Sequence, residues 1–126
     1  MWADALEMLQ SAERLQRQFF HVGAAREQGG FWEPPVDVFE KGDEFWIYFA
    51  VPGVREEQLE VVIEGNTLVV RGERRLAPAA RGAGIYRLEI PYGRFERRVS
   101  LPPERYQVLQ RVLDSGCLVL GLRRLG

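Results

Sequence analysis

The feature that most constrains the fold is a series of short apolar runs, separated by proline and glycine, that begins at Pro34 and continues to the end of the chain. Apolar and polar residues alternate in several of these runs, as they do in a strand with one buried face. Short strands at regular spacing, with turn signals between them, predict an all-β sandwich. The expected strands are residues 36–40, 45–51, 59–63, 68–70, 85–90, 95–101, 108–113 and 117–122.

Two segments of this series are unusual. Residues 45–51, Phe-Trp-Ile-Tyr-Phe-Ala-Val, are apolar or aromatic at every position, so we expect this strand to be covered on both sides. Residues 74–84 form a connection that is rich in small residues and longer than a hairpin needs. Loops of this length in a compact domain are usually functional or mobile.

The segment before the strands has a different pattern. Residues 2–22 are predicted to form a short amphipathic helix, because apolar side chains recur at helical spacing, and Gly23, Gly29 and Gly30 then indicate a flexible link. We expect residues 1–30 to form an arm and residues 31–126 a single domain. The helix either docks on that domain or is an apolar arm that meets partners or unfolded chains. Its apolar stripe contains Trp2, Ala5, Leu6, Leu9, Ala12 and Phe19.

The inventory of reactive side chains argues against an enzyme. The 126 residues include one histidine, His21, with no serine or cysteine constellation nearby. The one cysteine, Cys117, has apolar neighbours, so a buried small hydrophobe is favoured over a nucleophile. A single cysteine cannot form an intrachain disulfide or a four-cysteine zinc site. Because the sequence also lacks a glycine-rich phosphate loop, we expect no metal and no cofactor.

The sequence also predicts a cytoplasmic location. No run approaches the roughly 18 apolar residues of a membrane span, so we expect the chain to have no membrane-spanning segment. Asp4 and Glu7 lie near the start of the chain, where a secretion signal would have a basic segment followed by an apolar one.

Charge is divided between two halves of the chain. Residues 33–64 hold nine acidic and two basic residues, a net charge of −7, whereas residues 71–111 hold ten arginines and four acidic residues, a net charge of +6. The basic half could form a nucleic-acid surface, which salt-sensitive retention on DNA would reveal. The basic half lacks the signature of a nucleic-acid-binding motif, so we expect no nucleic-acid partner. We expect instead that the acidic and basic halves pair with each other, within one subunit or between subunits.

Five motifs occur in order along the chain and together cover residues 34 to 122. They are Phe31 to Glu40, Val51-Pro52-Gly53-Val54 followed by Glu56, Leu68 to Arg74, Tyr92 to Pro102, and Gly116-Cys117-Leu118. Each motif is weak alone. Together they resemble the α-crystallin domain of small heat-shock proteins, of the bacterial and plant type.

That resemblance implies an immunoglobulin-like antiparallel β-sandwich and an ATP-independent holdase, a stress-response chaperone that binds partly unfolded client proteins and prevents their aggregation. Covering a client's apolar surface requires no chemical reaction. The burial itself contributes roughly 25 cal/mol of favourable free energy per Å² of apolar surface covered. The resemblance also implies a homodimer formed by strand exchange, in which residues 85–89 pair with the partner's sheet near residues 36–39. An ordinary hairpin within one chain is the alternative. The expected interface residues are Ile85, Tyr86, Arg87, Leu88, Glu89 and Arg97.

Arg97 matches the family's characteristic arginine at the dimer region. Strand alternation independently places it on the same face as Phe95, Val99 and Leu101. We therefore expect a partly buried side chain with a carboxylate partner. A surface arginine whose charged end reaches water is the alternative.

The chain departs from the family pattern at its C-terminal end. The family usually carries an Ile-x-Ile extension that docks in an edge groove of a neighbouring dimer, whereas this chain stops at Leu122-Arg123-Arg124-Leu125-Gly126. We expect dimers, with small higher oligomers as the alternative, and a groove that is open to clients or to the arm. Arg111 also falls where the family commonly has an alanine. The expected client-binding residues are Trp2, Leu6, Leu9, Phe19 and Phe20 in the arm, and Val61, Ile63 and Val112 in the groove.

A CS-type co-chaperone, or another protein-interaction module, is the alternative function. Such a module shares the sandwich but serves a chaperone partner instead of unfolded clients. It normally lacks an exchanged strand, so the long excursion of residues 74–90 argues against it.

Overall fold

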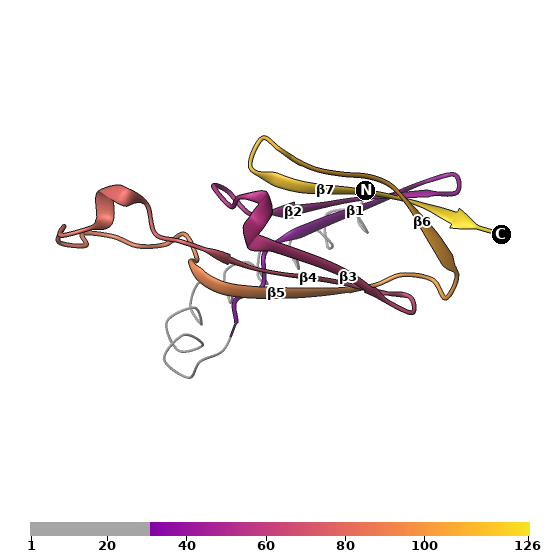
Figure 1. Ribbon diagram of the computed structural model, residues 1–126, viewed down its shortest axis with the longest axis horizontal. Helices are drawn as coiled ribbons and strands as arrows, with labels where there is room; N and C mark the ends of the chain where they lie inside the picture. Colours follow the sequence, from indigo (N-terminus) through magenta and orange to yellow (C-terminus); the bar gives the residue numbers. More distant parts are fainter. Residues whose placement is uncertain (1–30) are drawn as a thin grey trace, which may run out of the picture.

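A computed structural model describes residues 31–126 and confirms the predicted all-β sandwich. Seven strands form two antiparallel sheets that lie face to face (Figure 1). The predicted helix over residues 2–22 lies outside the described residues. The elements are β1 (Val36–Lys41), β2 (Glu44–Ala50), the short 3-10 helix η1 (Glu56–Gln58), β3 (Leu59–Glu64), β4 (Thr67–Arg74), the short 3-10 helix η2 (Pro78–Ala80), β5 (Gly93–Ser100), β6 (Arg105–Asp114) and β7 (Cys117–Leu125).

The strand order determines which backbones are left at the edges. The four-stranded sheet has the order β1-β2-β7-β6, and the three-stranded sheet has the order β3-β4-β5. β1 and β6 are therefore the edge strands of the larger sheet, and β3 and β5 those of the smaller one. An edge strand presents unpaired N–H and C=O groups, to which a further strand can bind.

The core lies between the two sheets and follows the predicted alternation of side chains. In β2, Phe45, Ile47 and Phe49 are buried while Tyr48 is exposed. The other strands also send alternate apolar residues inward, because successive side chains of a strand point to opposite faces. The buried core contains Leu68 and Val70 of β4, Phe95 of β5, and Leu118, Leu120 and Leu122 of β7.

The chain enters the sandwich beside β5. Trp32 is hydrogen-bonded along this strand: its N–H donates to the carbonyl of Arg94 at 3.2 Å, and its carbonyl accepts from the N–H of Glu96 at 3.1 Å. The Trp32 indole packs on Phe95, with 5.2 Å between ring centroids. The two prolines that follow, Pro34 and Pro35, carry the chain across to β1.

The register of β6 on β7 shifts between Val108 and Gln110, which is a β-bulge. An extra residue in one strand reverses the faces of the residues that follow it. After the bulge, Leu113 is opposite the buried Leu118, and Val112 is opposite Val119 on the other face of the sheet.

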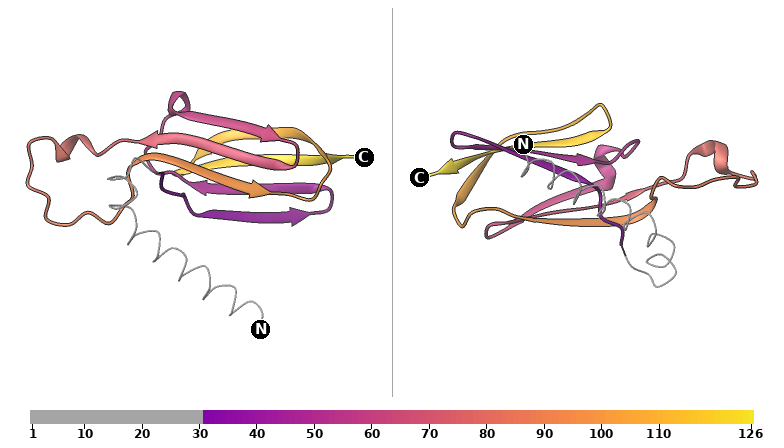
Figure 2. Two further views of the ribbon diagram at one scale, coloured as in Figure 1. Left: turned by 90° about the horizontal axis from the view of Figure 1, so that it is seen from below. Right: turned by 180° about the vertical axis from the view of Figure 1, so that it is seen from behind.

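Residues 85–90, which were predicted to form a strand, do not form one in this chain. They belong to a loop that extends beyond the sandwich on the side away from the C-terminus, in both views of Figure 2. Within residues 31–126 these six positions pair with no strand, so the alternative of an ordinary hairpin within one chain is wrong. The physical reason is position: the loop leaves the sheets, and no strand of the described chain lies beside it.

Candidate dimerisation and client-binding surfaces

The projecting loop is fixed at its base by one arginine. Arg74, the last residue of β4, donates from Nε to the carbonyl of Pro52 at 2.8 Å and from a terminal guanidinium nitrogen to the carbonyl of Pro91 at 3.2 Å. Both ends of the loop are thereby held together against the end of β2. The residues between them extend away from the body (Figure 1).

The loop exposes apolar side chains that a single domain would normally bury. Ile85 is 62% exposed, Ile90 56% and Leu88 45%, and Tyr86 is fully exposed. A strand-like segment of this kind can add itself to the open edge of another sheet, where backbone hydrogen bonds supply affinity and alternate side chains supply specificity. Arg87 and Glu89 lie 3.5 Å apart within the same segment.

The edge strand β1 is exposed both along its backbone edge and at most of its side chains. It has a free backbone edge, and every residue from Asp37 to Lys41 is exposed. Val38 and Phe39 contribute apolar surface, and Asp37 and Glu40 contribute negative charge. The described residues therefore include an exposed apolar segment, residues 85–90, that belongs to no sheet, and a strand, β1, with a free backbone edge.

Arg97 is buried, as predicted, and faces the core side of β5 next to Phe95. Its guanidinium lies 3.5 Å from a carboxylate oxygen of Glu33, and the Arg97 side chain is 8% exposed whereas that of Glu33 is 51% exposed. This ion pair joins β5 to the segment that leads into β1. The expected carboxylate partner is confirmed, and the alternative of a surface arginine is wrong.

Ion pairs within one chain join the acidic half of the sequence to the basic half. Arg71 lies 3.9 Å from Glu60, Arg98 lies 3.4 Å from Glu64, and Arg111 lies 3.0 Å from Glu56, measured between the charged atoms. The expected pairing of the two halves is thus confirmed within a subunit. Many of the arginines that could have formed a nucleic-acid surface are instead engaged with carboxylates.

A further short contact joins Arg71 and Glu96, which lie on neighbouring strands and both belong to the basic half of the sequence. The Arg71 Nε donates to Glu96 at 2.5 Å. This hydrogen bond lowers the pKa of the Glu96 carboxyl below its usual value, and the nearby charge of Arg98 acts in the same direction. The same hydrogen bond raises the pKa of Arg71. Both charges are therefore retained over a wide pH range.

The structure brings together two of the three predicted groove residues. Val61 and Ile63 lie on the inner side of the edge strand β3, opposite the buried Val70 and Leu68. Val112 lies on the outer face of β6 and does not join them, because the bulge in β6 turns Leu113 inward in its place. The prediction that Val112 lines a groove together with Val61 and Ile63 is therefore wrong, because Val112 lies on the other face of its sheet.

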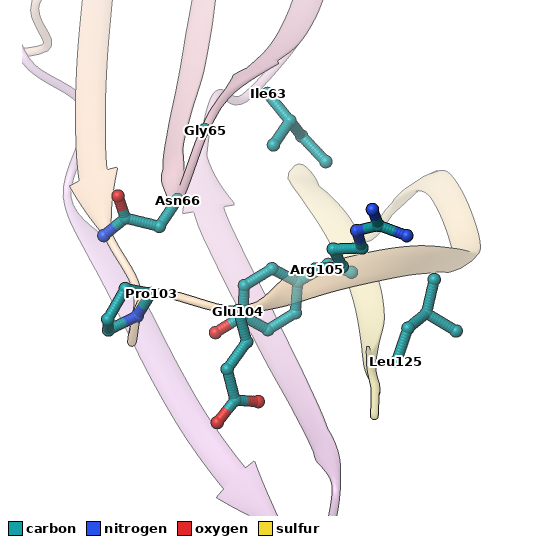
Figure 3. Close-up of a pocket in the computed structure, with 8 residues that line it drawn as sticks. Ile63, Gly65, Asn66, Pro103, Glu104, Arg105 and Leu125 are labelled. Atoms are coloured by element: carbon teal, nitrogen blue, oxygen red, sulfur yellow. The ribbon is translucent and has the colours of Figure 1, made fainter.

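A hollow of about 650 Å³ lies beside Ile63, between the β3–β4 turn and the start of β6. In Figure 3, Ile63 lies on one side of it and Leu125 on the other, with Arg105 between them and the Glu104 side chain extending away from Ile63. Ile63 is 37% exposed and Leu125 48% exposed. The hollow can take an apolar side chain of a bound polypeptide and offers both charges at its rim.

Several predictions fall on residues that the structure does not describe. The expected client-binding residues Trp2, Leu6, Leu9, Phe19 and Phe20 lie in residues 1–30, as does His21. Cys117 is described and is partly exposed at the start of β7. Within residues 31–126, no cluster of three or more potential metal ligands occurs, and no helix is long and apolar enough to cross a membrane.

Sequence reasoning missed a cluster at the end of the sandwich near the hollow. Arg124 lies over the ring of Phe45, 4.8 Å from its centroid, and its side chain is paired with Glu40 and Glu104. The ring of Tyr106 meets that of Phe45 edge to face. The buried parity of Phe45 could have been read from the sequence. The partner could not, because alternation places Arg124 on the same face as Leu120 and Leu122 but does not show that β2 is the neighbouring strand.

Comparison with known families and structures gives consistent matches. Residues 37–124 match the Hsp20/alpha crystallin family. The small heat shock protein IbpA of Serratia proteamaculans is 33% identical over 97% of this chain and 88% of its own length. The 16.9 kDa class I heat shock protein 1 of Triticum aestivum is 29% identical over 95% of this chain and 78% of its own length.

Solved structures show the same fold. The hspA protein of Xanthomonas axonopodis is 30% identical, with a TM-score of 0.61 over 74% of this chain and 94% of that chain. A small heat-shock protein of Xylella fastidiosa is 26% identical, with a TM-score of 0.64 over 75% of this chain and 88% of that chain.

Proposed function

Because the chain belongs to the Hsp20/alpha crystallin family of small heat-shock proteins, we propose that it is an ATP-independent holdase that binds partly unfolded proteins and prevents their aggregation. The observation that carries the proposal is the apolar surface along the open edges of the sandwich. Val38 and Phe39 of β1, Ile63 of β3 and Val108 of β6 are each between 37% and 55% exposed. The proposed activity is binding without catalysis, and we assign it to the cytoplasm.

The physical basis of the proposed activity is the burial of apolar surface. A partly unfolded client exposes apolar side chains, and covering a few hundred Å² of them is worth several kcal/mol, at roughly 25 cal/mol per Å². Much of this is offset by the ordering of both partners. Binding at each site is therefore weak, and an assembly with several sites holds a client through their combined effect.

The proposed unit is a homodimer formed by exchange of the loop strand. Residues 85–90 of one subunit would add to β1 of the other, which satisfies the free backbone edge and covers the exposed loop side chains. The similar protein from Xylella fastidiosa forms a distinct high order structure, which supports assembly beyond the single chain. The proposed interface residues are Ile85, Tyr86, Arg87, Leu88, Glu89 and Arg97.

Two surfaces are proposed to bind clients. One is the arm, through the large apolar residues Trp2, Leu6, Leu9, Phe19 and Phe20. The other is the sandwich surface at Val61 and Ile63 of β3, beside the 650 Å³ hollow that Ile63 lines. Val112 remains a proposed contact, on the outer face of the four-stranded sheet and not in the groove.

A scattering experiment tests the holdase activity directly. A heat-unfolding client is warmed without nucleotide, alone or with the protein at several subunits per client, and light scattering is followed. We expect scattering to be suppressed, and an equal mass of an unrelated globular protein to leave it unchanged. Scattering that rises equally with both proteins would show that the chain is not a holdase.

The contribution of the arm is tested with the full-length chain. A triple substitution of Trp2, Leu6 and Leu9 by serine removes apolar surface from the stripe. Its matched control replaces Glu7, Gln10 and Arg14 by serine, residues that the helical spacing places on the opposite side of the predicted helix. We expect weaker client protection from the first variant only. Equal protection by both would assign client binding to the sandwich.

A further inference from the structure

The two outer faces of the sandwich differ in chemistry. The outer face of the three-stranded sheet carries the ion pairs of Arg71 and Arg98 with neighbouring glutamates, as expected of a sheet face that meets water. The outer face of the four-stranded sheet instead carries an apolar set that spans all four strands. This set, called the aromatic face below, consists of Phe39, Trp46, Tyr48, Val112 and Val119.

The strand register places the aromatic face in two adjacent rows. Phe39 is opposite Trp46 in one row, and Tyr48, Val119 and Val112 are opposite one another in the next. The rings of Phe39 and Tyr48 meet edge to face, with 5.9 Å between centroids and 80° between planes. Phe39 is 55% exposed and Tyr48 37% exposed. Trp46 and Val112 are partly exposed, whereas Val119 is buried, and the two rows end in the polar residues Gln110 and Asp37. The exposed apolar surface is therefore that of Phe39, Tyr48, Trp46 and Val112.

Trp46 is fixed as the floor of this surface. It covers the backbone of Gly121, where a Cβ atom would lie 2.7 Å from the indole ring. Its Nε1 donates to Glu44 at 2.9 Å, and Arg123 donates to the same carboxylate at 3.0 Å. These hydrogen bonds lower the pKa of Glu44, so the contact is kept at neutral pH. Glycine at 121 thus allows the indole to lie close against the sheet.

Exposed apolar patches on a soluble protein mark surfaces that another segment covers. β2 is the strand that most clearly requires cover on its outer side. Ile47 and Phe49 are fully buried in the core, while Trp46 and Tyr48 belong to the aromatic face. The sequence of this strand predicts cover on both sides. The core supplies that cover on one side only.

The position at which the described chain begins indicates what can reach the other side. Phe31 is four residues before Pro35, a distance of at most about 13 Å. The carbonyl of Pro35 accepts a hydrogen bond from Ala50 at 3.0 Å, and Ala50 is two residues from Tyr48. The link of residues 23–30 can span about 26 Å when extended. A helix formed by residues 2–22 is therefore within reach of the aromatic face of its own chain.

We propose that residues 2–22 of each chain dock, as an amphipathic helix, on the aromatic face of the same chain. The sequence gives this segment an apolar stripe with two aromatic residues, Trp2 and Phe19, and a polar opposite side. A helix with one apolar stripe and a sheet with one apolar face bury these surfaces against each other. The docked helix provides the cover on the second side of β2. The proposal does not depend on whether the chain is a holdase, and a client could bind the stripe only when the helix leaves this face.

The native cysteine provides a probe beside the proposed contact. Cys117 is partly exposed, opposite Ala50, and on the same outer face as Val119 two residues later. The full-length chain is labelled there with a benzophenone maleimide, illuminated, digested and analysed by mass spectrometry. An equal mixture of ¹⁵N-labelled and unlabelled chains distinguishes links within a chain from links between chains. We expect Cys117 to link to peptides from residues 2–22 of the same chain.

Matched variants separate docking from chance proximity. In one control, the probe is moved to the outer face of the other sheet by combining Cys117→Ser with Ser100→Cys, and we expect the links to residues 2–22 to be lost. In a second comparison, Tyr48→Lys and Phe39→Lys should each reduce the yield from Cys117 several-fold, whereas Ser100→Lys should not. Circular dichroism verifies that each variant keeps its strands.

Three outcomes would overturn the proposal. The first is the absence of links to residues 2–22 from the Cys117 probe. The second is links to this segment that occur only between chains, which would assign the aromatic face to the arm of another copy. The third is links to residues 36–50 of a second chain, which would show that two four-stranded sheets pack together.

Discussion

Among residues 31–126, Arg97 is the charged residue that the sandwich buries, and its value to the fold is best seen against its neighbour. Arg97→Ala removes a buried guanidinium that pairs with Glu33 and should lower the free energy of unfolding by about 2 kcal/mol. Arg98→Ala, on the opposite face with a half-exposed side chain, should cost less than about 1 kcal/mol. Urea unfolding of the three proteins measures both values. Equal losses would mean that burial of Arg97 contributes nothing specific.

The hydrogen bond between Arg71 and Glu96 predicts a pH dependence of stability. The pKa of Glu96 is lower in the folded protein than in the unfolded chain, so its ionised form stabilises the fold above the unfolded pKa of about 4.3. This contribution is lost as the pH falls through the lowered folded pKa. We expect Glu96→Gln to be less stable than the unmodified protein at pH 7 and the difference to disappear in acid. Urea midpoints that differ equally at both pH values would contradict this.

At the scale of the elements, alternation of side chains predicts the strands well, because the core imposes the same alternation. The run of residues 45–51 corresponds to β2, and the parity of Phe95 and Arg97 corresponds to the inner face of β5. The predicted strand over residues 85–90 differs, since a strand needs a neighbour and the single chain provides none. The face of the sheet on which Val112 lies could not be predicted, because it depends on the β-bulge in β6. The alternation of apolar and polar residues does not reveal a bulge.

The loop segment should be necessary for assembly. Replacing Ile85 and Leu88 together by aspartate places charge on the segment proposed to pair with β1 of the partner. We expect the dimer to dissociate, with the mass measured by light scattering on a column falling to that of one subunit. Leu76→Asp is the control, since Leu76 is exposed in the same loop but lies outside residues 85–90. An unchanged mass for the double variant would place the interface elsewhere.

At the scale of the whole molecule, the divided charge has two uses. Pairs such as Arg98 with Glu64 join the sheet strands within one chain. In the proposed dimer, the basic loop would also meet the acidic residues of β1, which favours association of opposite surfaces. Such exposed contacts weaken as salt shortens the screening length from about 10 Å at 0.1 M to about 3 Å at 1 M.

A charge reversal tests this role. Asp37→Lys on β1 should raise the dissociation constant of the dimer several-fold, and the effect should shrink in high salt. Asp114→Lys makes the same change of charge at the β6–β7 turn, on the opposite edge of the sheet, and should leave the constant unchanged. Sedimentation at two salt concentrations measures each variant. An equal effect of both substitutions would reflect net charge alone.

The loop fixed by Arg74 has a consequence for the life of the protein in a cell. Before the proposed pairing, a single subunit would present Tyr86 and its neighbours to proteases as an exposed, extended substrate, because cleavage concentrates at exposed loop tips. Pairing with a second copy would remove that substrate in proportion to the number of copies present. The protein's half-life would then lengthen as its synthesis increases and shorten as synthesis declines, so that its abundance would follow demand without a dedicated degradation signal.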